Sequence, residues 1–256
     1  MRLDRYLVEM GKFDSRQKAQ EAIKAGRVLL NGVVVRKASC MIPYVSIVPE
    51  STQDITLAPH TATPHITILG TTYVSRAALK LKGFLEECIR VGIVMDWKNA
   101  IDVGAARGGF SQVLLECGVG EIWCVDVGSN QLHPMLLNDT RIISFEQCDI
   151  RSFAANTTRI FDGVVCDVSF IGTKQIFDVL TRLGKEMILL FKPQFEVGRE
   201  AKRSKRGVVL DSSLVHKALQ EFITFVESKG FCVRMCKPSH IKGKEGNAEF
   251  FIYVCR

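Results

Sequence analysis

The chain has 256 residues, of which 47% are hydrophobic and 24% are charged. This composition is typical of a globular protein with a sizeable core and room for a second small domain. The net charge of +7 fits either an evenly basic surface or a surface that binds an anionic partner such as RNA. The nine cysteines are scattered without a C-x-x-C pair and lie apart from the histidines, so we expect buried thiols and neither a metal site nor a disulfide framework.

The sequence predicts no targeting or membrane segment. Asp4 interrupts the basic-then-apolar pattern that a signal peptide requires, and no apolar run approaches the ~18 to 20 residues needed to span a bilayer. We therefore expect a cytoplasmic protein.

Residues 1–57 are expected to form a first, α+β unit. Apolar spacing predicts helices over 1–10 and 15–25, followed by a hairpin with strands over 28–30 and 33–35 around an Asn31-Gly32 turn. Positive charge is concentrated in this unit. Five basic residues could share one face of the helix pair and bind phosphate, namely Arg2, Arg5, Arg16, Lys18 and Arg27.

Two motifs in this unit, R-L-D-R-Y-L and S-R-x-x-A-x-x-x-I-x-x-G-R-V-x-x-N-G, resemble the alpha-L RNA-binding domain. That domain is shared by a small-subunit ribosomal protein, pseudouridine synthases and tyrosyl-tRNA synthetases, and the resemblance implies RNA binding. The alternative is a small helical cap with solvated charges. Residues 58–72, rich in proline, threonine and histidine, predict a moderately stiff linker, part of which (65–69) could be a short strand.

Residues 73–256 are expected to form an α/β domain that opens with an amphipathic helix over 76–91. Strands are predicted over 100–103, 122–127, 141–145, 161–167 and 186–192, alternating with helices over 109–117, 131–137, 173–183 and 211–229. Two last strands, over 231–236 and 248–254, have no long helix between them, which predicts an antiparallel pair at the sheet edge. The pattern is that of a Rossmann-like domain with a seven-stranded sheet.

A glycine turn follows the first of these strands. The stretch N-A-I-D-V-G-A-A-R-G-G-F over 99–110 reads as a strand, a tight turn and a helix start, which lets a nucleotide-like ligand approach bare backbone. It is not the strict dinucleotide fingerprint, because Ala106 stands where the middle glycine would be. Asp126, near the end of the next strand, is placed to bind ribose hydroxyls.

Two more polar residues end buried strands on the same side of the sheet. Asp167 follows F-D-G-V-V-C and Lys192 follows M-I-L-L-F, and ligands of open parallel sheets bind beyond the carboxyl ends of the strands. A buried lysine amine beside another cation could lose its proton and act as a base, with Asp167 orienting it. The alternatives are a helix cap for Asp167 and a solvated strand end for Lys192.

The pattern D-x-G-x-x-x-G-G-F, with an acid after the next strand, is similar to motifs I and II of S-adenosylmethionine-dependent methyltransferases. Over nearly the full chain the sequence resembles the hemolysin A (TlyA) family of rRNA methyltransferases, whose catalytic domain is FtsJ-like. The resemblance implies a catalytic tetrad of Lys80, Asp167, Lys192 and Glu249. It also implies S-adenosylmethionine binding by Asp102, Gly104, Ala105, Gly108, Gly109, Asp126 and Asp149, the last of these near the adenine.

Three further features bear on the substrate. The glycine turn carries Ala106-Arg107 where the family more usually has a small polar pair, so Arg107 could face substrate or solvent. Phe170 could stack on cofactor or base, or pack in the core. The loop after the predicted catalytic strand is either an RNA-gripping lid or a solvated loop; its basic residues are Arg199, Lys202, Arg203, Lys205 and Arg206.

The resemblance implies S-adenosylmethionine-dependent 2′-O-methylation of a cytidine in ribosomal RNA, offered as RNA or as an assembled ribosomal subunit. We expect a monomer that needs no metal. The compact ends of the chain favour the large subunit as the sole target. One alternative is a membrane-active hemolysin without enzymatic activity, as the family name suggests. Another is an NAD-dependent enzyme, which the missing middle glycine disfavours.

Overall fold

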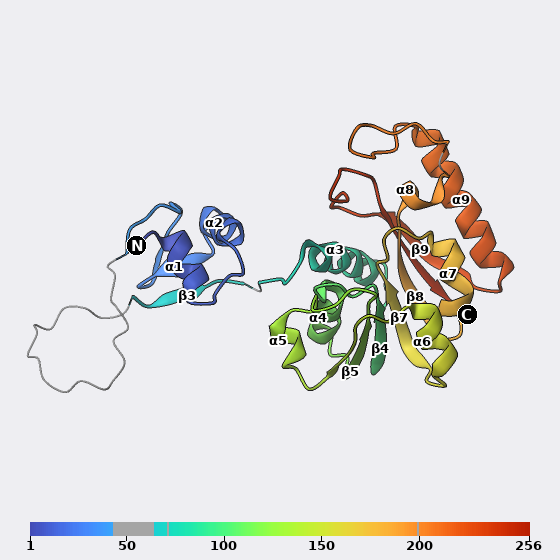
Figure 1. The fold of residues 1–256 in the computed structure, drawn as a ribbon, viewed down its shortest axis with the longest axis horizontal. Helices are drawn as coiled ribbons and strands as arrows, with labels where there is room; N and C mark the ends of the chain where they lie inside the picture. Colours follow the sequence, from blue (N-terminus) through green and yellow to red (C-terminus); the bar gives the residue numbers. More distant parts are fainter. Residues whose placement is uncertain (43–63, 71, 199) are drawn as a thin grey trace, which may run out of the picture. The chain divides into compact units, whose positions relative to one another are not determined.

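The computed structural model describes residues 1–42, 64–70, 72–198 and 200–256. The chain divides into two compact units, Met1–Thr72 and Tyr73–Arg256, both drawn in Figure 1. Residues 43–57 of the predicted first unit, and residues 58–63 and 71 of the predicted linker, lie outside the described residues.

The first unit packs two helices against a small sheet. Helices α1 (Leu3–Glu9) and α2 (Arg16–Lys24) and strands β1 (Val28–Leu30) and β2 (Val33–Val34) follow the sequence prediction. Asn31 and Gly32 have φ values of 51° and 81°, as a two-residue hairpin turn requires. The short strand considered for the linker exists as β3 (Ile66–Ile68) and pairs antiparallel with β1. This segment therefore completes the sheet of the first unit.

The second unit is built on a seven-stranded sheet in the order β6-β5-β4-β7-β8-β10-β9. Five strands are parallel, namely β4 (Asn99–Val103), β5 (Glu121–Val125), β6 (Ile142–Phe145), β7 (Phe161–Cys166) and β8 (Gly184–Phe191). The antiparallel edge consists of β9 (Cys232–Pro238) and β10 (Phe250–Cys255), with β10 between β8 and β9. The Rossmann-like fold and the antiparallel pair at the edge are confirmed.

Helices cover both faces of this sheet (Figure 1). One face carries α3 (Arg76–Arg90), α4 (Gly109–Glu116) and α5 (Pro134–Leu137), and the other carries α6 (Ile150–Asn156), α7 (Thr173–Leu180) and α9 (Ser212–Ser228). On the first face the rings of Phe84 and Phe251 stack with centroids 4.8 Å apart, which joins α3 to β10. Because both faces are covered, the parallel strands are apolar on both sides.

Two short helices were not predicted from the sequence, α6 and α8 (Pro193–Glu196). Helix α6 begins after Asp149, whose carboxylate accepts a hydrogen bond from the N–H of Arg151. Helix α8 begins directly after Lys192, and Pro193 fills its first position, where its missing N–H leaves no donor unpaired. Both helices start at the carboxyl ends of strands and so shape the surface there.

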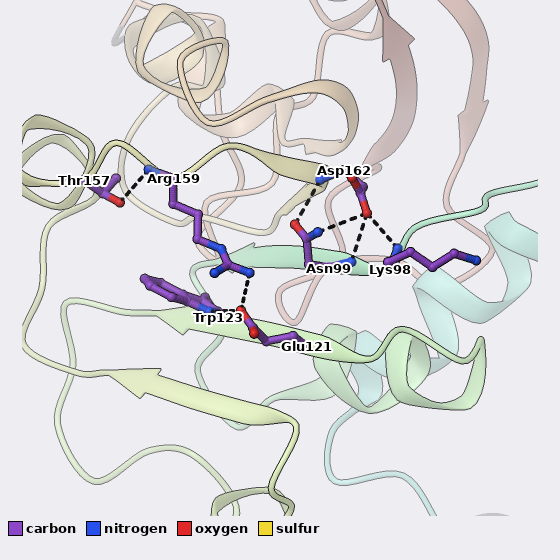
Figure 2. A network of polar contacts seen from close by, with 7 residues as sticks. All are labelled: Lys98, Asn99, Glu121, Trp123, Thr157, Arg159 and Asp162. Carbon is purple, nitrogen blue, oxygen red and sulfur yellow. Dashed lines mark hydrogen bonds and ion pairs between the residues drawn. The ribbon is translucent and has the colours of Figure 1, made fainter.

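Polar contacts hold the amino ends of the strands in register (Figure 2). One carboxylate oxygen of Asp162, on β7, accepts hydrogen bonds from the backbone N–H of Lys98 and Asn99 and from the side chain of Asn99. On β5, Glu121 forms an ion pair of 2.6 Å with Arg159, which lies just before β7. These contacts fix one end of the sheet, and the polar residues singled out by the sequence lie at the other.

Candidate active site

The glycine turn lies at the carboxyl end of β4, between β5 and β7, where an open α/β sheet binds ligands. Gly104 and Gly108 both have φ of 81°. A Cβ at Gly104 would lie 2.8 Å from the carbonyl oxygen of Asp167, and a Cβ at Gly109 would lie 2.1 Å from Ser75 Oγ. The glycines therefore let the turn pack tightly against the end of β7 and the start of α3.

Asp102 is a buried carboxylate with one oxygen in use. Its Oδ2 accepts hydrogen bonds from the N–H (2.9 Å) and Oγ–H (2.6 Å) of Ser111, whereas Oδ1 is buried without a hydrogen-bond partner among the described residues. Burial raises the pKa of the Asp102 carboxyl to about 7. A buried acceptor is costly until a ligand supplies a donor, so Oδ1 suits a ligand ammonium group.

Two adjoining cavities flank the turn. The first, of about 340 Å³, is largely apolar and contains Asp126 and Asp149. The second, of about 290 Å³, is more polar and is lined by Asp102, Ala105 and Asp167 among others. Because Gly104 and Ala106 line both, the two form one crevice, which fits a nucleoside with an amino-acid tail. Two predicted cofactor residues line neither cavity and instead support the turn, Gly108 and Gly109.

The two acids of the first cavity are held in place by the backbone and by an arginine. Asp126 accepts hydrogen bonds from the N–H of Ala106 (2.8 Å) and of Gly128 (2.7 Å), one on each oxygen. Each oxygen keeps a lone pair for a ribose hydroxyl. Asp149 forms a bidentate ion pair with Arg151, which lowers the pKa of the Asp149 carboxyl to about 2. The Asp149 carboxylate is therefore ionised at neutral pH, and both acids present oxygens that can accept hydrogen bonds from a ligand.

Lys192 follows β8 and contacts the residues that follow β7. Its Nζ lies 2.6 Å from Asp167 Oδ1 and donates a hydrogen bond to Ser169 Oγ at 2.9 Å. Lys192 is only 8% exposed, so the solvated strand end is wrong. The helix cap is also wrong for Asp167, because Gly172 is the N-cap of the next helix. Only its place two positions after Asp167 could have pointed to Ser169 from the sequence.

The Asp167 carboxyl bears on the protonation of this pair. Burial raises the pKa of Asp167, and the positive charge of Lys192 opposes that shift. Burial therefore favours a proton on the Asp167 carboxyl, whereas the contact with Lys192 favours the ionised carboxylate.

The other two residues of the predicted tetrad form a second buried ion pair. Lys80 Nζ lies 2.6 Å from Glu249 Oε2, and the two side chains are 9% and 4% exposed. Glu249 directly precedes β10, which runs antiparallel to β8. The first residue of β10, Phe250, pairs with Phe191, the last residue of β8. Glu249 therefore lies beside Lys192. The structure brings all four predicted catalytic residues together at one end of the sheet.

A third cavity, of about 690 Å³, opens beside these pairs and is lined by Lys80, Lys192 and Glu249. Lys192 and Ser169 also line the polar end of the crevice. Lys192 therefore lies where the two cavities adjoin. A ligand in the crevice could transfer a group there to an acceptor molecule in the third cavity. The third cavity also carries four basic side chains, Arg76, Arg203, Arg206 and Lys244.

Phe170 lines both the apolar part of the crevice and the third cavity. Its side chain is 93% exposed, so packing in the core is wrong. The ring centroid lies 5.7 Å from that of Phe195. Its φ of 68° is a conformation that costs a bulky residue about 1–3 kcal/mol. An exposed ring on a strained backbone is typical of a ligand contact.

The basic loop after α8 is not uniformly solvated. The Arg203 guanidinium donates hydrogen bonds to three backbone carbonyls of α8 and its own loop, so Arg203 shapes the loop. Lys202, Lys205 and Arg206 are exposed, whereas Arg199 lies outside the described residues. Three of the four basic side chains described in this loop are therefore open to solvent.

Acids organise the basic face of the first unit. Arg2 and Arg16 both pair with the fully buried Asp4, at 2.9 and 3.2 Å, and the hydrogen bond from Arg2 holds the pKa of the Asp4 carboxyl well below its usual range. Arg5 and Lys18 pair with acids four positions away. The Arg2 and Arg16 side chains remain 45% and 55% exposed, and a guanidinium carries five donors. Both can therefore meet phosphate while paired.

In the described part of the chain, no helix combines the length and apolar character needed to cross a membrane. The same residues contain no group of three or more His, Cys, Asp or Glu that could hold a metal ion.

Comparison with known proteins identifies the class of each unit. The FtsJ-like methyltransferase family matches residues 73–256, and the S4 domain family matches residues 1–42. The second unit is therefore a methyltransferase domain of the FtsJ-like type, and the first is an S4 domain.

Relatives match over almost the whole chain. The 23S rRNA (cytidine-2′-O)-methyltransferase TlyA of Campylobacter jejuni is 43% identical over 245 residues, 94% of each chain. The 16S/23S rRNA (cytidine-2′-O)-methyltransferase TlyA of Mycobacterium tuberculosis is 31% identical over 258 residues, 99% of this chain and 89% of the relative. A solved structure described as a hemolysin from Streptococcus thermophilus is 31% identical with a TM-score of 0.64, covering 100% of this chain and 88% of that one. The chain belongs to the TlyA family of methyltransferases.

Proposed function

We propose that this protein transfers the methyl group of S-adenosylmethionine to the ribose 2′-hydroxyl of a cytidine in ribosomal RNA. The activity named for its TlyA relatives supports this proposal. The observation on this chain that carries it is the position of Lys192, which lines both the crevice and the third cavity. The relative named for 23S rRNA alone is the more similar of the two, so the large subunit is the first substrate to test.

The crevice fits S-adenosylmethionine. The apolar cavity suits the adenine, with Asp149 at its edge, and Asp126 suits the ribose. Gly104 and Ala105 would border the methionine part, and the unpartnered Oδ1 of Asp102 would accept a hydrogen bond from its ammonium group. When bound, S-adenosylmethionine supplies an electrophilic methyl group on a sulfonium.

Lys192 would act as the general base. A ribose hydroxyl is a poor nucleophile until it loses its proton, and a positioned neutral amine can accept that proton. Asp167 and Ser169 hold the amine in place. Lys80, fixed by Glu249, is a second cation in the same cavity and would stabilise the developing negative charge on the ribose oxygen.

Several other residues would hold the RNA. Phe170 would stack on the target base, because its exposed ring lines both the apolar cavity of the crevice and the third cavity. The exposed charges of the loop after α8 would bind phosphates near the target. The S4 domain would bind a separate part of the RNA through Arg2, Arg5, Arg16, Lys18 and Arg27. We expect the protein to act as a monomer in the cytoplasm, where ribosomal subunits are found.

A methylation assay tests the proposal. Free rRNA and both ribosomal subunits, prepared from a strain that lacks this protein, are incubated with S-adenosylmethionine, and modified riboses are mapped by primer extension at low nucleotide concentration. We expect modified cytidines in 23S rRNA. Absence of any rRNA methylation by the wild-type protein contradicts the proposal, and a hemolysis assay on the same preparation tests the membrane-active alternative.

The Lys192→Ala variant tests the base. It should fold and bind S-adenosylhomocysteine like the wild type but methylate at least about 100-fold more slowly. Lys185→Ala, at the exposed amino end of the same strand, is the matched control and should behave like the wild type. Near-wild-type turnover by Lys192→Ala would remove the assignment.

A further inference from the structure

The polar end of the crevice offers charges of both signs to a ligand. Asp102 contributes a buried oxygen without a hydrogen-bond partner among the described residues. Two cationic side chains line this cavity, Lys192 and Arg107. Lys192 contacts Asp167 and Ser169. In the proposed function its amine accepts the proton of the ribose hydroxyl. The amino-acid end of a ligand carries a carboxylate as well as an ammonium group, and Arg107 is the cation that the mechanism does not use.

The backbone around Arg107 is fixed. The N–H of Ala106 donates a hydrogen bond to Asp126, and the carbonyl of Arg107 accepts one from the N–H of His133 at 3.4 Å. Gly108 is the N-cap of α4. The Arg107 Nε donates a hydrogen bond to the carbonyl of Val74 at 3.3 Å. The backbone of Arg107 and the Nε of its guanidinium are thus held in place by hydrogen bonds.

We infer that Arg107 binds the carboxylate of the methionine part of S-adenosylmethionine, opposite the ammonium group on Asp102; this deepens, and rests on, the proposed use of that cofactor. The planar fork of a guanidinium matches a carboxylate in a bidentate pair. Asp102 and Arg107 line the same polar cavity, so together they complement a zwitterion. The sequence left open whether Arg107 faces substrate or solvent. Its place in the polar cavity assigns it to the cofactor instead.

A pair of ligands that differ in one group tests the contact. S-adenosylmethionine and decarboxylated S-adenosylmethionine share adenine, ribose, sulfonium and amine, and only the first has a carboxylate. Binding of both is measured by titration calorimetry with the wild type, Arg107→Gln and Arg107→Lys. Arg90→Gln, an exposed arginine near the end of α3, is the control for loss of one positive charge.

The wild type should bind S-adenosylmethionine about tenfold more tightly than the decarboxylated ligand. Arg107→Gln should lose this preference, with S-adenosylmethionine binding about tenfold more weakly and the decarboxylated ligand unchanged. Arg107→Lys should keep part of the preference, because it retains a charge without the fork, and Arg90→Gln should keep all of it. Such a cycle isolates the interaction between one residue and one ligand group.

Two results would overturn the inference. Equal losses for both ligands would mean that Arg107 acts through Val74 on the shape of the cavity, and unchanged binding of S-adenosylmethionine by Arg107→Gln would mean no contact at all. Circular dichroism of each variant separates these results from unfolding. A wild-type protein that binds neither ligand would instead refute the proposed function, and with it the contact.

Discussion

Lys80 and Glu249 are separated by 169 positions in the chain, yet their buried side chains form an ion pair of 2.6 Å. The pair joins α3, which precedes the sheet of the second unit, to β10, its last strand. A buried pair contributes little net stability compared with apolar residues, but removal of one partner leaves an uncompensated charge. Replacing both residues by apolar ones should therefore keep the fold while removing their role in catalysis.

Glu249→Ala should lower the free energy of unfolding of the second unit by about 3 kcal/mol. The double variant Lys80→Met, Glu249→Leu should recover most of that loss, while both variants lose methyl transfer. Urea unfolding followed by tryptophan fluorescence measures this, because both tryptophans, Trp97 and Trp123, lie in the second unit. A double variant that is no more stable than the single one would show that the buried charge is not the cause.

Asp102→Asn should stabilise the protein without ligand and weaken the binding of S-adenosylmethionine. The pKa of Asp102 is raised to about 7, so the folded state holds the proton more tightly than the unfolded state, whose aspartate pKa is about 3.9. The contribution of this group is fully present below pH ~4 and is lost as pH rises to ~7. Asparagine stays neutral and avoids the loss, which is at most about 4 kcal/mol.

The thermal midpoints of wild type and Asp102→Asn should therefore differ little at pH 4.5 and diverge up to about pH 7, with the variant higher. Asp96→Asn, whose side chain is 85% exposed, is the control and should show no such divergence. Equal midpoints at pH 8 would mean that Asp102 is not a strained buried carboxylate. In the same samples, asparagine presents an amide N–H in place of one oxygen, which accounts for weaker binding of the ligand ammonium group.

The sequence predicted the sheet well because its signals are local. Apolar runs such as M-I-L-L-F mark strands buried on both faces, and the absence of a long helix between the last two marks the antiparallel edge. The missed helices α6 and α8 are short, with seven and four residues. Helix α6 starts at an N-cap, Asp149, which the sequence analysis assigned to the adenine, and α8 starts at Pro193.

For the site, strand ends predicted Asp167 and Lys192, because parallel strands bring their carboxyl ends together. No spacing rule pairs Lys80 with Glu249; that assignment came from family resemblance, and the contact depends on β10 being antiparallel to β8. Charge patterns did not reveal the backbone carbonyls that hold the Arg203 guanidinium, because such contacts depend on how the loop folds. Local patterns thus give elements and their ends, whereas partners require the tertiary fold.

Phe170→Gly should change stability and activity in opposite directions. Glycine adopts a φ of 68° without strain, so unfolding should require about 1 kcal/mol more. Loss of the ring should lower kcat/KM for rRNA about 10- to 100-fold, as expected for loss of one stacked base. Phe170→Tyr keeps the ring and should retain activity. Full activity in Phe170→Gly would show that the exposed ring does not bind the base.

The exposed loop residues Lys205 and Arg206 should contribute to RNA affinity through phosphate contacts alone. Each contact with a single-stranded segment adds about 0.7 to the slope of log K against log salt concentration, so Lys205→Gln with Arg206→Gln should reduce the slope by about 1.4. The control double variant Arg90→Gln, Lys185→Gln removes the same charge elsewhere on the second unit and should leave the slope unchanged.

Arg203→Gln should act differently, because its guanidinium bonds three carbonyls of the polypeptide. We expect weaker RNA binding with little change in the salt slope, accompanied by faster proteolysis of the loop. Filter binding of an rRNA fragment between 50 and 200 mM salt measures both effects. A slope that falls equally for Arg203→Gln and for the double variant would show that Arg203 also contacts phosphate, and that its role in the loop does not exclude one at the RNA.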